Sequence, residues 1–539
     1  MLQISAIVQN VLKPYISGIK HLFTMEIFLY TAMGLLRILH FLSHPVYAYF
    51  SKGKKKSVPP IKNDLLTISA TDLAAKIRER KIKSVDLCKA YIERIKEVES
   101  IINAVVEERF EEALEDARKV DNYIANCSDA TILELEKIKP LFGVPFTVKE
   151  SCSLKGMSLS VGSLTREGYK ADQDGECVAA VKASGAIPLL VSNTPELCLS
   201  WESFNLIKGV TRNPYDISRS SAGSSGGEGA LLGAGASVIG IGSDIAGSIR
   251  VPALFNGIFG HKPTPRIAPI KGHYPFCSDP RYPDFLVVGP MTRYAKDLKL
   301  LLKIMVGDKS DDLRLDEPVD IGDLNVYVME DAGFMMTVAS VETAIKKSVK
   351  RSAKYLSDKF GCTIIKDNTF AELADSNEIG GSVLYAIEDI PNVLKWDNSK
   401  LPIELLKSIM GHSKYSLNVL TFYIVQHIYN NFVSDHSVQN AALKRLFIEK
   451  LGTNGVLIYP TWTNTASKHH EFYFHLASIM YVMMANTLGL PATHVPCGLD
   501  KNGLPVGIQV IAAPNQDRLC LAVAEELEKG FGGWVPPGH

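Results

Sequence analysis

The stretch from Ser220 to Ala253 constrains the fold of this chain more than any other. Between Ser220 and Ser248, 21 of 29 residues are Gly, Ala or Ser, yet the stretch is neither repetitive nor strongly polar. Residues this small let one backbone segment pass close to another and leave mainly peptide NH groups and hydroxyls for chemistry. The larger apolar residues within it are Leu231, Leu232, Val238, Ile239 and Ile241. Since these must be buried, the stretch predicts a tightly packed element and not a flexible linker.

The composition indicates a globular protein with no general attraction for nucleic acid. Of the 539 residues, 46% are hydrophobic, and 58 Lys and Arg balance 58 Asp and Glu. This hydrophobic content supports a large core, and zero net charge provides no basic field for a polyanion. The nine cysteines are scattered, odd in number and without a CxxC pair. We therefore expect reduced thiols, no metal site and no cofactor.

Residues 1–51 are predicted to form a membrane anchor, with a helix over about residues 22–50. Ile27–Phe50 carries one formal charge, Arg37, and a helix of that length can cross a bilayer, which takes roughly 20 residues. Residues 52–64 are lysine-rich at first and then contain two prolines, which is typical of a linker. The excess of lysines after the helix favours a cytosolic position for the rest of the chain. An interfacial helix, a buried core helix and a secretory signal are the alternatives.

Residues 65–539 are predicted to form one α/β domain. The apolar run LFGVPFTVKE, Leu141–Glu150, has the pattern of a buried strand that ends at Lys149. Glu176–Ser184 follows as a helix and Ala186–Ser192 as a strand, which gives a βαβ unit in a parallel or mixed sheet. A lysine at the end of a buried strand is either a snorkelling side chain or a functional one.

The small-residue stretch itself divides into three predicted elements. A helix starts near Ser225, Ser237–Ser243 forms a strand, and a second helix starts near Ile249. Serines therefore lie close to two helix N-termini, where unpaired NH groups and a positive partial charge favour binding of an oxyanion.

Several familiar motifs are absent or incomplete. There is no GxxxxGK[ST] phosphate loop, and the dinucleotide pattern that starts at Gly240 lacks its third glycine. His470, Glu471 and His475 miss the HExxH spacing by one residue, so we interpret them as surface residues. GSSGG matches the nucleophile elbow GxSxG with Ser225 at its centre, an alternative that would also require a downstream Asp and His.

A longer set of motifs resembles the amidase signature family. The segments GVPFTVKE, GSSGGEGA and SDIAGSIRVPA carry Lys149, Ser224 and Ser248, and further matches are NPYD, GPMTR, NTLGLPA and GLPVGIQVI. FNGIFGHKP and the terminal GGWVPPG are most similar to the membrane-anchored fatty-acid amide hydrolases of the second type. The resemblance covers about residues 65–539. It implies a mixed, twisted β-sheet covered by helices on both faces.

The resemblance also implies a Ser-Ser-Lys triad. Ser248 corresponds to the nucleophile, Ser224 to a bridging serine and Lys149 to the base, and a buried lysine can serve as a base only while it is neutral. The implied oxyanion donors are the backbone NH groups of Ile245, Ala246, Gly247 and Ser248. The implied supporting residues are Ser225, Asp244 and Arg250. Two alanines, Ala246 and Ala222, stand where these relatives usually have glycine, so a narrowed site or a strained backbone angle is expected there.

The predicted substrate is a lipid amide at a membrane. Ile403–Phe432 has the pattern of a greasy helix pair, interpreted as a cap insertion with a core helix pair as the alternative. Leu199 and Trp201 stand where the family lines its acyl pocket. We expect hydrolysis of fatty-acid primary amides or N-acylethanolamines on an internal membrane such as the endoplasmic reticulum or a lipid droplet, by a monomer or homodimer. The alternatives are an amidase for small amides, an amide-transfer subunit, or a non-catalytic lipid-binding relative.

Overall fold

The computed structural model describes residues 56–333, 338–366, 370, 373, 376–395 and 397–538. The predicted anchor, residues 1–51 with its helix over 22–50, lies outside the described residues. Within the described ranges, no helix is both long and apolar enough to cross a bilayer.

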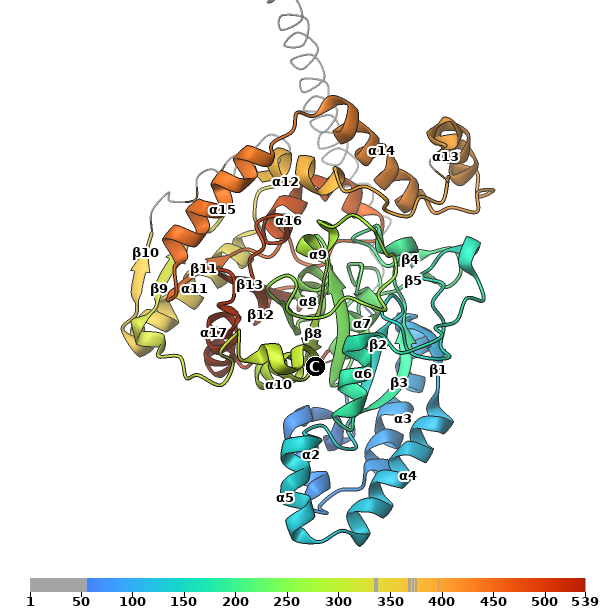
Figure 1. Cartoon of the computed structure of the whole chain (residues 1–539), viewed down its shortest axis with the longest axis vertical. Coiled ribbons are helices and arrows are strands. Elements are labelled where there is room, and N and C mark those ends of the chain that lie inside the picture. The colour runs from blue at the N-terminus through green and yellow to red at the C-terminus, as the bar shows by residue number, and fades with distance from the viewer. Residues whose placement is uncertain are drawn as a thin grey trace, which may run out of the picture.

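An eleven-stranded mixed sheet forms the centre of the molecule (Figure 1). Its order is β1-β3-β2-β6-β8-β7-β12-β13-β11-β9-β10. Strands β3, β2 and β6 run parallel to one another, as do β11, β9 and β10, and the remaining pairs are antiparallel. The strands are β1 Val105–Glu108, β2 Pro145–Lys149, β3 Ile187–Ser192, β6 Ile239–Asp244, β7 Phe259–Lys262, β8 Val287–Thr292, β9 Asn325–Val328, β10 Thr363–Ile365, β11 Gly455–Tyr459, β12 Ala492–Leu499 and β13 Pro505–Ala512. A separate hairpin pairs β4, Phe204–Asn205, with β5, Gly209–Val210.

Helices surround this sheet, and they confirm the expected α/β architecture. In Figure 1 α2–α5 form a lobe at the bottom, and α12–α15 form an arc at the top. The helices are α2 Ala70–Arg78, α3 Ser84–Ile102, α4 Phe110–Asn126, α5 Asp129–Ile138, α6 Glu176–Ala183, α7 Gly226–Gly233, α8 Arg250–Asn256, α9 Tyr282–Phe285, α10 Ala295–Val306, α11 Thr343–Phe360, α12 Ser376–Tyr385, α13 Leu401–Ile409, α14 Leu417–Phe432, α15 Ser437–Leu451, α16 Met480–Thr487 and α17 Asp517–Phe531.

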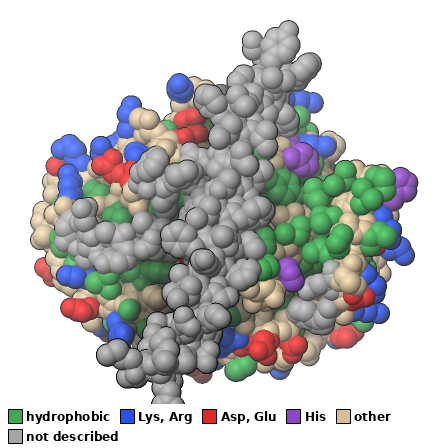
Figure 2. All heavy atoms as spheres, turned by 90° about the horizontal axis from the view of Figure 1, so that it is seen from above, with side chains coloured by type: hydrophobic (Ala, Val, Ile, Leu, Met, Phe, Trp, Pro, Cys, Tyr) green, Lys and Arg blue, Asp and Glu red, His purple; other side chains and the backbone are tan. Residues whose placement is uncertain are grey.

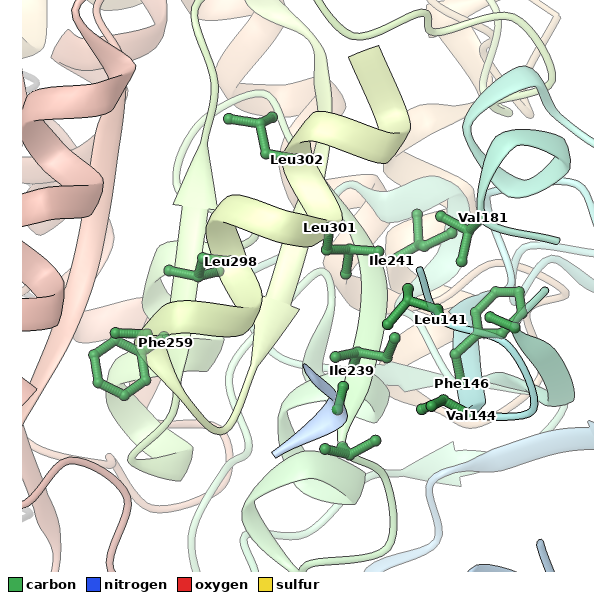
Figure 3. Close-up of a cluster of buried hydrophobic side chains, with 14 of the residues drawn as sticks. Leu141, Val144, Phe146, Val181, Ile239, Ile241, Phe259, Leu298, Leu301 and Leu302 are labelled. Atoms are coloured by element: carbon green, nitrogen blue, oxygen red, sulfur yellow. The ribbon is translucent and has the colours of Figure 1, made fainter. Parts of the chain in front are cut away.

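The largest core cluster packs β2 and β6 against α6 and α10 (Figure 3). Phe146 on β2 and Ile241 on β6 point into this cluster, together with Val181 of α6 and Leu301 of α10. Because successive strand residues face opposite sides of a sheet, Thr147 and Lys149 point the other way, toward α7. The Thr147 hydroxyl accordingly donates to the Glu228 carboxylate on α7.

Close packing of α7 on the sheet explains the small residues between Ser220 and Ala253. A Cβ on Gly227 would lie 2.5 Å from the backbone N and O of Asn193, and a Cβ on Gly240 would lie 1.9 Å from a Glu228 oxygen. The Asn193 atoms belong to the backbone, so Gly227 admits no side chain unless the chain shifts, and a side chain at Gly240 would displace the buried Glu228 carboxylate. The predicted elements of this stretch are confirmed as α7, β6 and α8, and the βαβ unit is confirmed as β2, α6 and β3.

The sequence predicts a linker over residues 52–64, but its described part, residues 56–64, lies against the domain. The predicted linker therefore extends too far along the chain. Val58 is buried, and its NH donates to the Pro214 carbonyl at 3.0 Å. The Pro59 carbonyl accepts from the Arg94 guanidinium at 2.8 Å. Val58 and Ile61 give little hydrophobicity to a segment rich in Lys and Pro, so no sequence pattern predicts this docking.

Candidate active site

Lys149 is fully buried at the end of β2. Its Nζ lies 2.7 Å from Ser224 Oγ and 2.9 Å from Ser243 Oγ. The strand directs the side chain toward α7, where the loop that precedes this helix delivers Ser224. The structure therefore brings together two of the three residues of the expected triad, which lie 75 positions apart in the chain.

Ser248 lies in the loop between β6 and α8 and lines the same cavity as Ser224. The two loops are joined by a backbone hydrogen bond from the Ser225 NH to the Ser248 carbonyl at 3.2 Å. Among the described residues, no hydrogen bond joins the hydroxyls of Ser224 and Ser248. The two serines are therefore neighbours in one cavity, and only Ser224 is bonded to Lys149.

Ser225, the centre of the nucleophile-elbow pattern, is completely buried. Its Oγ lies 3.3 Å from the Ser243 carbonyl and 3.4 Å from the Ser243 NH, so it is engaged with the end of β6. Ser225 is not among the residues that line the cavity. Ser225 therefore links the loop before α7 to the end of β6 and to the Ser248 loop.

Asp244 and Arg250 form a fully buried ion pair that closes the Ser248 loop. Arg250 Nε and Nη2 each lie 3.1 Å from an Asp244 carboxylate oxygen. Burial opposes ionisation of Asp244, but the Arg250 charge and hydrogen bonds outweigh it and lower the pKa of this carboxyl to about 2. Arg250 is held in turn by Asn486 Oδ1 at 2.7 Å and Gln509 Oε1 at 3.0 Å, two residues that the sequence does not single out as part of the site.

One of the four expected oxyanion donors is already engaged in this loop. The Gly247 NH donates to Asp244 Oδ1 at 2.7 Å. Ile245, Ala246 and Ser248 line the cavity, whereas Gly247 does not. The geometry thus favours the NH groups of these three residues over that of Gly247.

The two alanines that replace glycines differ in backbone strain. Ala222 has φ of +62°, in the left-handed region that an alanine adopts only at a cost of roughly 1–2 kcal/mol. Ala246 does not have a positive φ, and its carbonyl accepts from Trp201 Nε1 at 2.8 Å. The strain expected at these positions is therefore confirmed only at Ala222.

A largely apolar cavity, with about 670 Å³ of empty space including its open mouth, leads to Ser248. Leu199 and Trp201, the predicted acyl-pocket residues, both line it. Phe422 of α14 also lines it, so the predicted cap insertion forms part of the wall. Further lining side chains that the sequence does not reveal are those of Leu197, Pro275, Tyr282, Leu286, Leu384, Tyr385 and Ile390.

His273 is a buried residue of the cavity wall that no sequence pattern indicates. Its Nε2 lies 3.0 Å from Ser243 Oγ, and its Nδ1 lies 3.3 Å from the Pro275 carbonyl oxygen. Burial and then the charge of Lys149 lower the pKa of His273 to about 3. A lone histidine in a loop gives no sequence signal for such a contact.

The cap leaves an apolar surface open. The two helices of the expected pair are confirmed as α13 and α14, and the residues between them include Gly411, which has φ of +71°. Hydrophobic side chains gather on the right of the face in Figure 2, the side on which α13 and α14 lie in Figure 1. The exposed large hydrophobic residues of α13 and the position after it are Ile403, Leu406, Ile409 and Met410.

In the described part of the chain, no group of three His, Cys, Asp or Glu side chains is arranged to hold a metal ion. The His470 ring, which is exposed, lies 3.7 Å from the buried Glu202 carboxylate. The ring of its neighbour His469 lies 2.9 Å from the same group.

The site thus combines a buried lysine that is hydrogen-bonded to a serine with a second serine that lines the same apolar cavity. The Amidase family model matches residues 86–521, and the chain belongs to this family of amide-cleaving hydrolases.

The similar proteins include two fatty-acid amide hydrolases from vertebrates. Fatty-acid amide hydrolase 2-A of Danio rerio is 40% identical over 94% of this chain and 97% of its own length. Fatty-acid amide hydrolase 2 of Homo sapiens is 39% identical over 95% of this chain and 98% of its own length. The solved structure of a fatty acid amide hydrolase has the same fold, with a TM-score of 0.65 and 24% identity over 87% of this chain and 86% of that one.

Proposed function

We propose that this protein is a membrane-bound serine amidase that hydrolyses fatty-acid amides, both primary amides and N-acylethanolamines, to a free fatty acid and an amine. The observation that carries the proposal is the buried 2.7 Å contact between Lys149 and Ser224 beside an apolar cavity that Ser248 also lines. The similarity to fatty-acid amide hydrolase 2 supports the same substrate class.

In the proposed reaction Ser248 Oγ attacks the amide carbonyl carbon. A serine hydroxyl is a weak nucleophile until a neighbour takes its proton, so Ser248 passes its proton to Ser224, and Ser224 passes its own to neutral Lys149. The attack requires the Ser248 hydroxyl to turn toward Ser224 within the cavity that both residues line. The carbonyl oxygen, now negative, is stabilised by NH groups of Ile245, Ala246 and Ser248, each worth on the order of 3 kcal/mol.

The proton then returns along the same path to the leaving amine. An amine leaves poorly unless it is protonated, so Lys149 acts as a base during attack and as an acid during collapse of the tetrahedral intermediate. The C–N bond breaks, and the acyl group remains as an ester on Ser248. Water attacks this ester in the second half of the reaction and releases the fatty acid. Asp244 and Arg250 keep the Ser248 loop in place throughout.

A long acyl chain is the substrate feature that the cavity supports best. Leu199, Trp201 and Phe422 provide apolar contacts along its wall, and burial of each methylene contributes about 0.8 kcal/mol. The exposed apolar residues of α13 provide a surface at which the enzyme would meet lipid. Together with the predicted anchor over residues 1–51, they support action at a membrane.

Competing hydrolysis of oleamide and acetamide tests the function. Membranes that carry the wild-type protein should convert oleamide much faster than acetamide, and membranes that carry Ser248→Ala should convert neither. Equal turnover of both amides would indicate an amidase for small amides and would refute the lipid proposal. Absence of any turnover by the wild type would support a non-catalytic relative, and glutamine-dependent amide transfer would indicate a transamidation subunit.

A further inference from the structure

His273 lies where its two ring nitrogens have fixed and different roles. Nδ1 faces the Pro275 carbonyl oxygen at 3.3 Å, and that oxygen also accepts from the Tyr282 hydroxyl at 3.0 Å. A carbonyl oxygen can only accept, so Nδ1 must carry a proton. In a neutral imidazole the other nitrogen, Nε2, is then an acceptor. The Ser243 hydroxyl, 3.0 Å away, is therefore the donor to Nε2.

The surroundings keep this imidazole neutral. The titratable groups around it are Lys149 on β2, Cys152, whose backbone pairs with that of His273, and Tyr282 on α9. Burial raises the pKa of Cys152 to about 12, so the thiol adds no negative charge, and burial also raises the pKa of Tyr282. Burial is the largest cause of the lowered pKa of His273 and acts whatever the charge of Lys149, so the imidazole does not gain a proton near neutral pH.

The hydrogen bond from Ser243 to His273 determines which hydrogen bonds Lys149 Nζ donates and which it accepts. Because the Ser243 hydroxyl gives its proton to His273, its oxygen can only accept from Lys149 Nζ at 2.9 Å. A neutral lysine has two N–H bonds and one lone pair. With one N–H directed to Ser243, the lone pair is free to face Ser224 Oγ at 2.7 Å.

We propose that His273 is a positioning residue that sets the direction of the hydrogen-bond chain running from Ser224 through Lys149 and Ser243 to the Pro275 carbonyl. This inference rests on the proposed function, in which Lys149 takes a proton from Ser224. Without an acceptor at position 273, the Ser243 hydroxyl can turn and donate to the Lys149 lone pair, where it competes with Ser224.

No proton is transferred at His273 in this scheme. When Ser224 takes the proton of Ser248, it releases its own to the Lys149 lone pair, and the nitrogen becomes an ammonium with three N–H bonds. Ser243 continues to accept one of them and to donate to His273 Nε2. The later step reverses this transfer and delivers the proton to the leaving amine. His273 therefore holds a hydrogen-bond direction and is neither the base nor the acid.

The test compares three single variants and one double variant in oleamide hydrolysis. His273→Leu removes the acceptor and should lower kcat by about 10- to 100-fold, which is a large part of the rate acceleration that a positioned general base provides. The KM for oleamide should change little. His273→Gln retains a carbonyl oxygen that can accept from Ser243 and should restore most of kcat. Ser243→Ala should lower kcat as well, and adding His273→Leu to it should cause little further loss, because both act through one chain.

A matched control is His261→Gln on β7. His261 is also a buried histidine bonded to a hydroxyl, with Nδ1 2.7 Å from Thr493 Oγ1, but it does not line the cavity. The His261→Gln variant should unfold at a lower urea concentration than the wild type, while its kcat for oleamide stays at the wild-type value. A loss of kcat in this control similar to that in His273→Leu would reduce the His273 effect to general destabilisation and overturn the proposal.

Three further results would overturn it. The first is a folded His273→Leu variant with the kcat of the wild type. The second is an equal loss of kcat in His273→Leu and His273→Gln. The third is a double variant whose loss of kcat equals the product of the losses in the two single variants. If the Leu variant fails to fold, the Gln and Ser243→Ala variants still decide the matter, because an unimpaired Ser243→Ala excludes the chain. Failure of the proposed function is recognised separately, as wild-type protein that does not hydrolyse oleamide or as Ser248→Ala protein that does.

Discussion

At the scale of single residues, the buried ion pair of Asp244 and Arg250 determines whether the Ser248 loop keeps its shape. Arg250→Met would leave the Asp244 carboxylate buried without its counter-charge, which should lower the free energy of unfolding by about 3–5 kcal/mol. Urea unfolding near neutral pH measures this loss. Lys354→Met is the control, because the Lys354–Asp358 pair is exposed and its removal should cost less than about 1 kcal/mol. Similar small losses in both variants would contradict this account of the loop.

The same pair predicts a pH dependence with a definite sign. The pKa of Asp244 is lowered from 3.8 to about 2 in the folded protein, so its ionised form contributes stability above about pH 4. This contribution is lost as the pH falls from about 4 to about 2. The difference in unfolding free energy between the wild type and Arg250→Met should therefore shrink across that window. A difference that stays constant would show that the carboxylate charge is not its source.

At the scale of elements, α13 presents apolar side chains that the fold does not cover. Ile409 is 73% exposed, so Ile409→Glu should not disturb folding. It should weaken docking on lipid and raise the KM for oleamide dissolved in phosphatidylcholine vesicles roughly tenfold, about the effect of one buried isoleucine. Its kcat should stay unchanged.

Val438→Glu on α15 is the control for this experiment. Val438 is equally exposed, at 74%, and it lies on a different helix. Its KM should equal that of the wild type. Equal effects of both substitutions would mean that added charge alone, and not loss of the α13 surface, weakens the use of vesicle-bound substrate.

At the scale of the whole molecule, local sequence patterns predict the individual helices and strands. They do not reveal contacts between residues that lie far apart in the chain. The strand that ends at Lys149 and the helices that begin near Ser225 and Ile249 follow from runs of a few residues. Asn486 and Gln509 reach Arg250 across 236 and 259 positions, so no local pattern could indicate these contacts. The contact of His273 is hidden for the same reason, since its partner Ser243 lies on a strand 30 residues earlier.

The docking of Val58 shows a further limit of composition. Lysines and prolines around it predict a solvated tether, but Val58 is buried, its NH donates to the Pro214 carbonyl, and the Pro59 carbonyl accepts from Arg94. The small-residue stretch is the opposite case. Its composition predicts close packing, and Gly227 lies where a Cβ would collide with the backbone of Asn193.

The most direct test of the central claim is to identify the serine that reacts. Membranes that carry the protein are treated with a fluorophosphonate probe, and the labelled peptide is mapped in wild type, Ser248→Ala, Ser225→Ala and Lys149→Ala. We expect label on Ser248 in the wild type, no label in Ser248→Ala, retained label in Ser225→Ala and slow labelling in Lys149→Ala. Persistent labelling of Ser248→Ala together with loss of label in Ser225→Ala would contradict it.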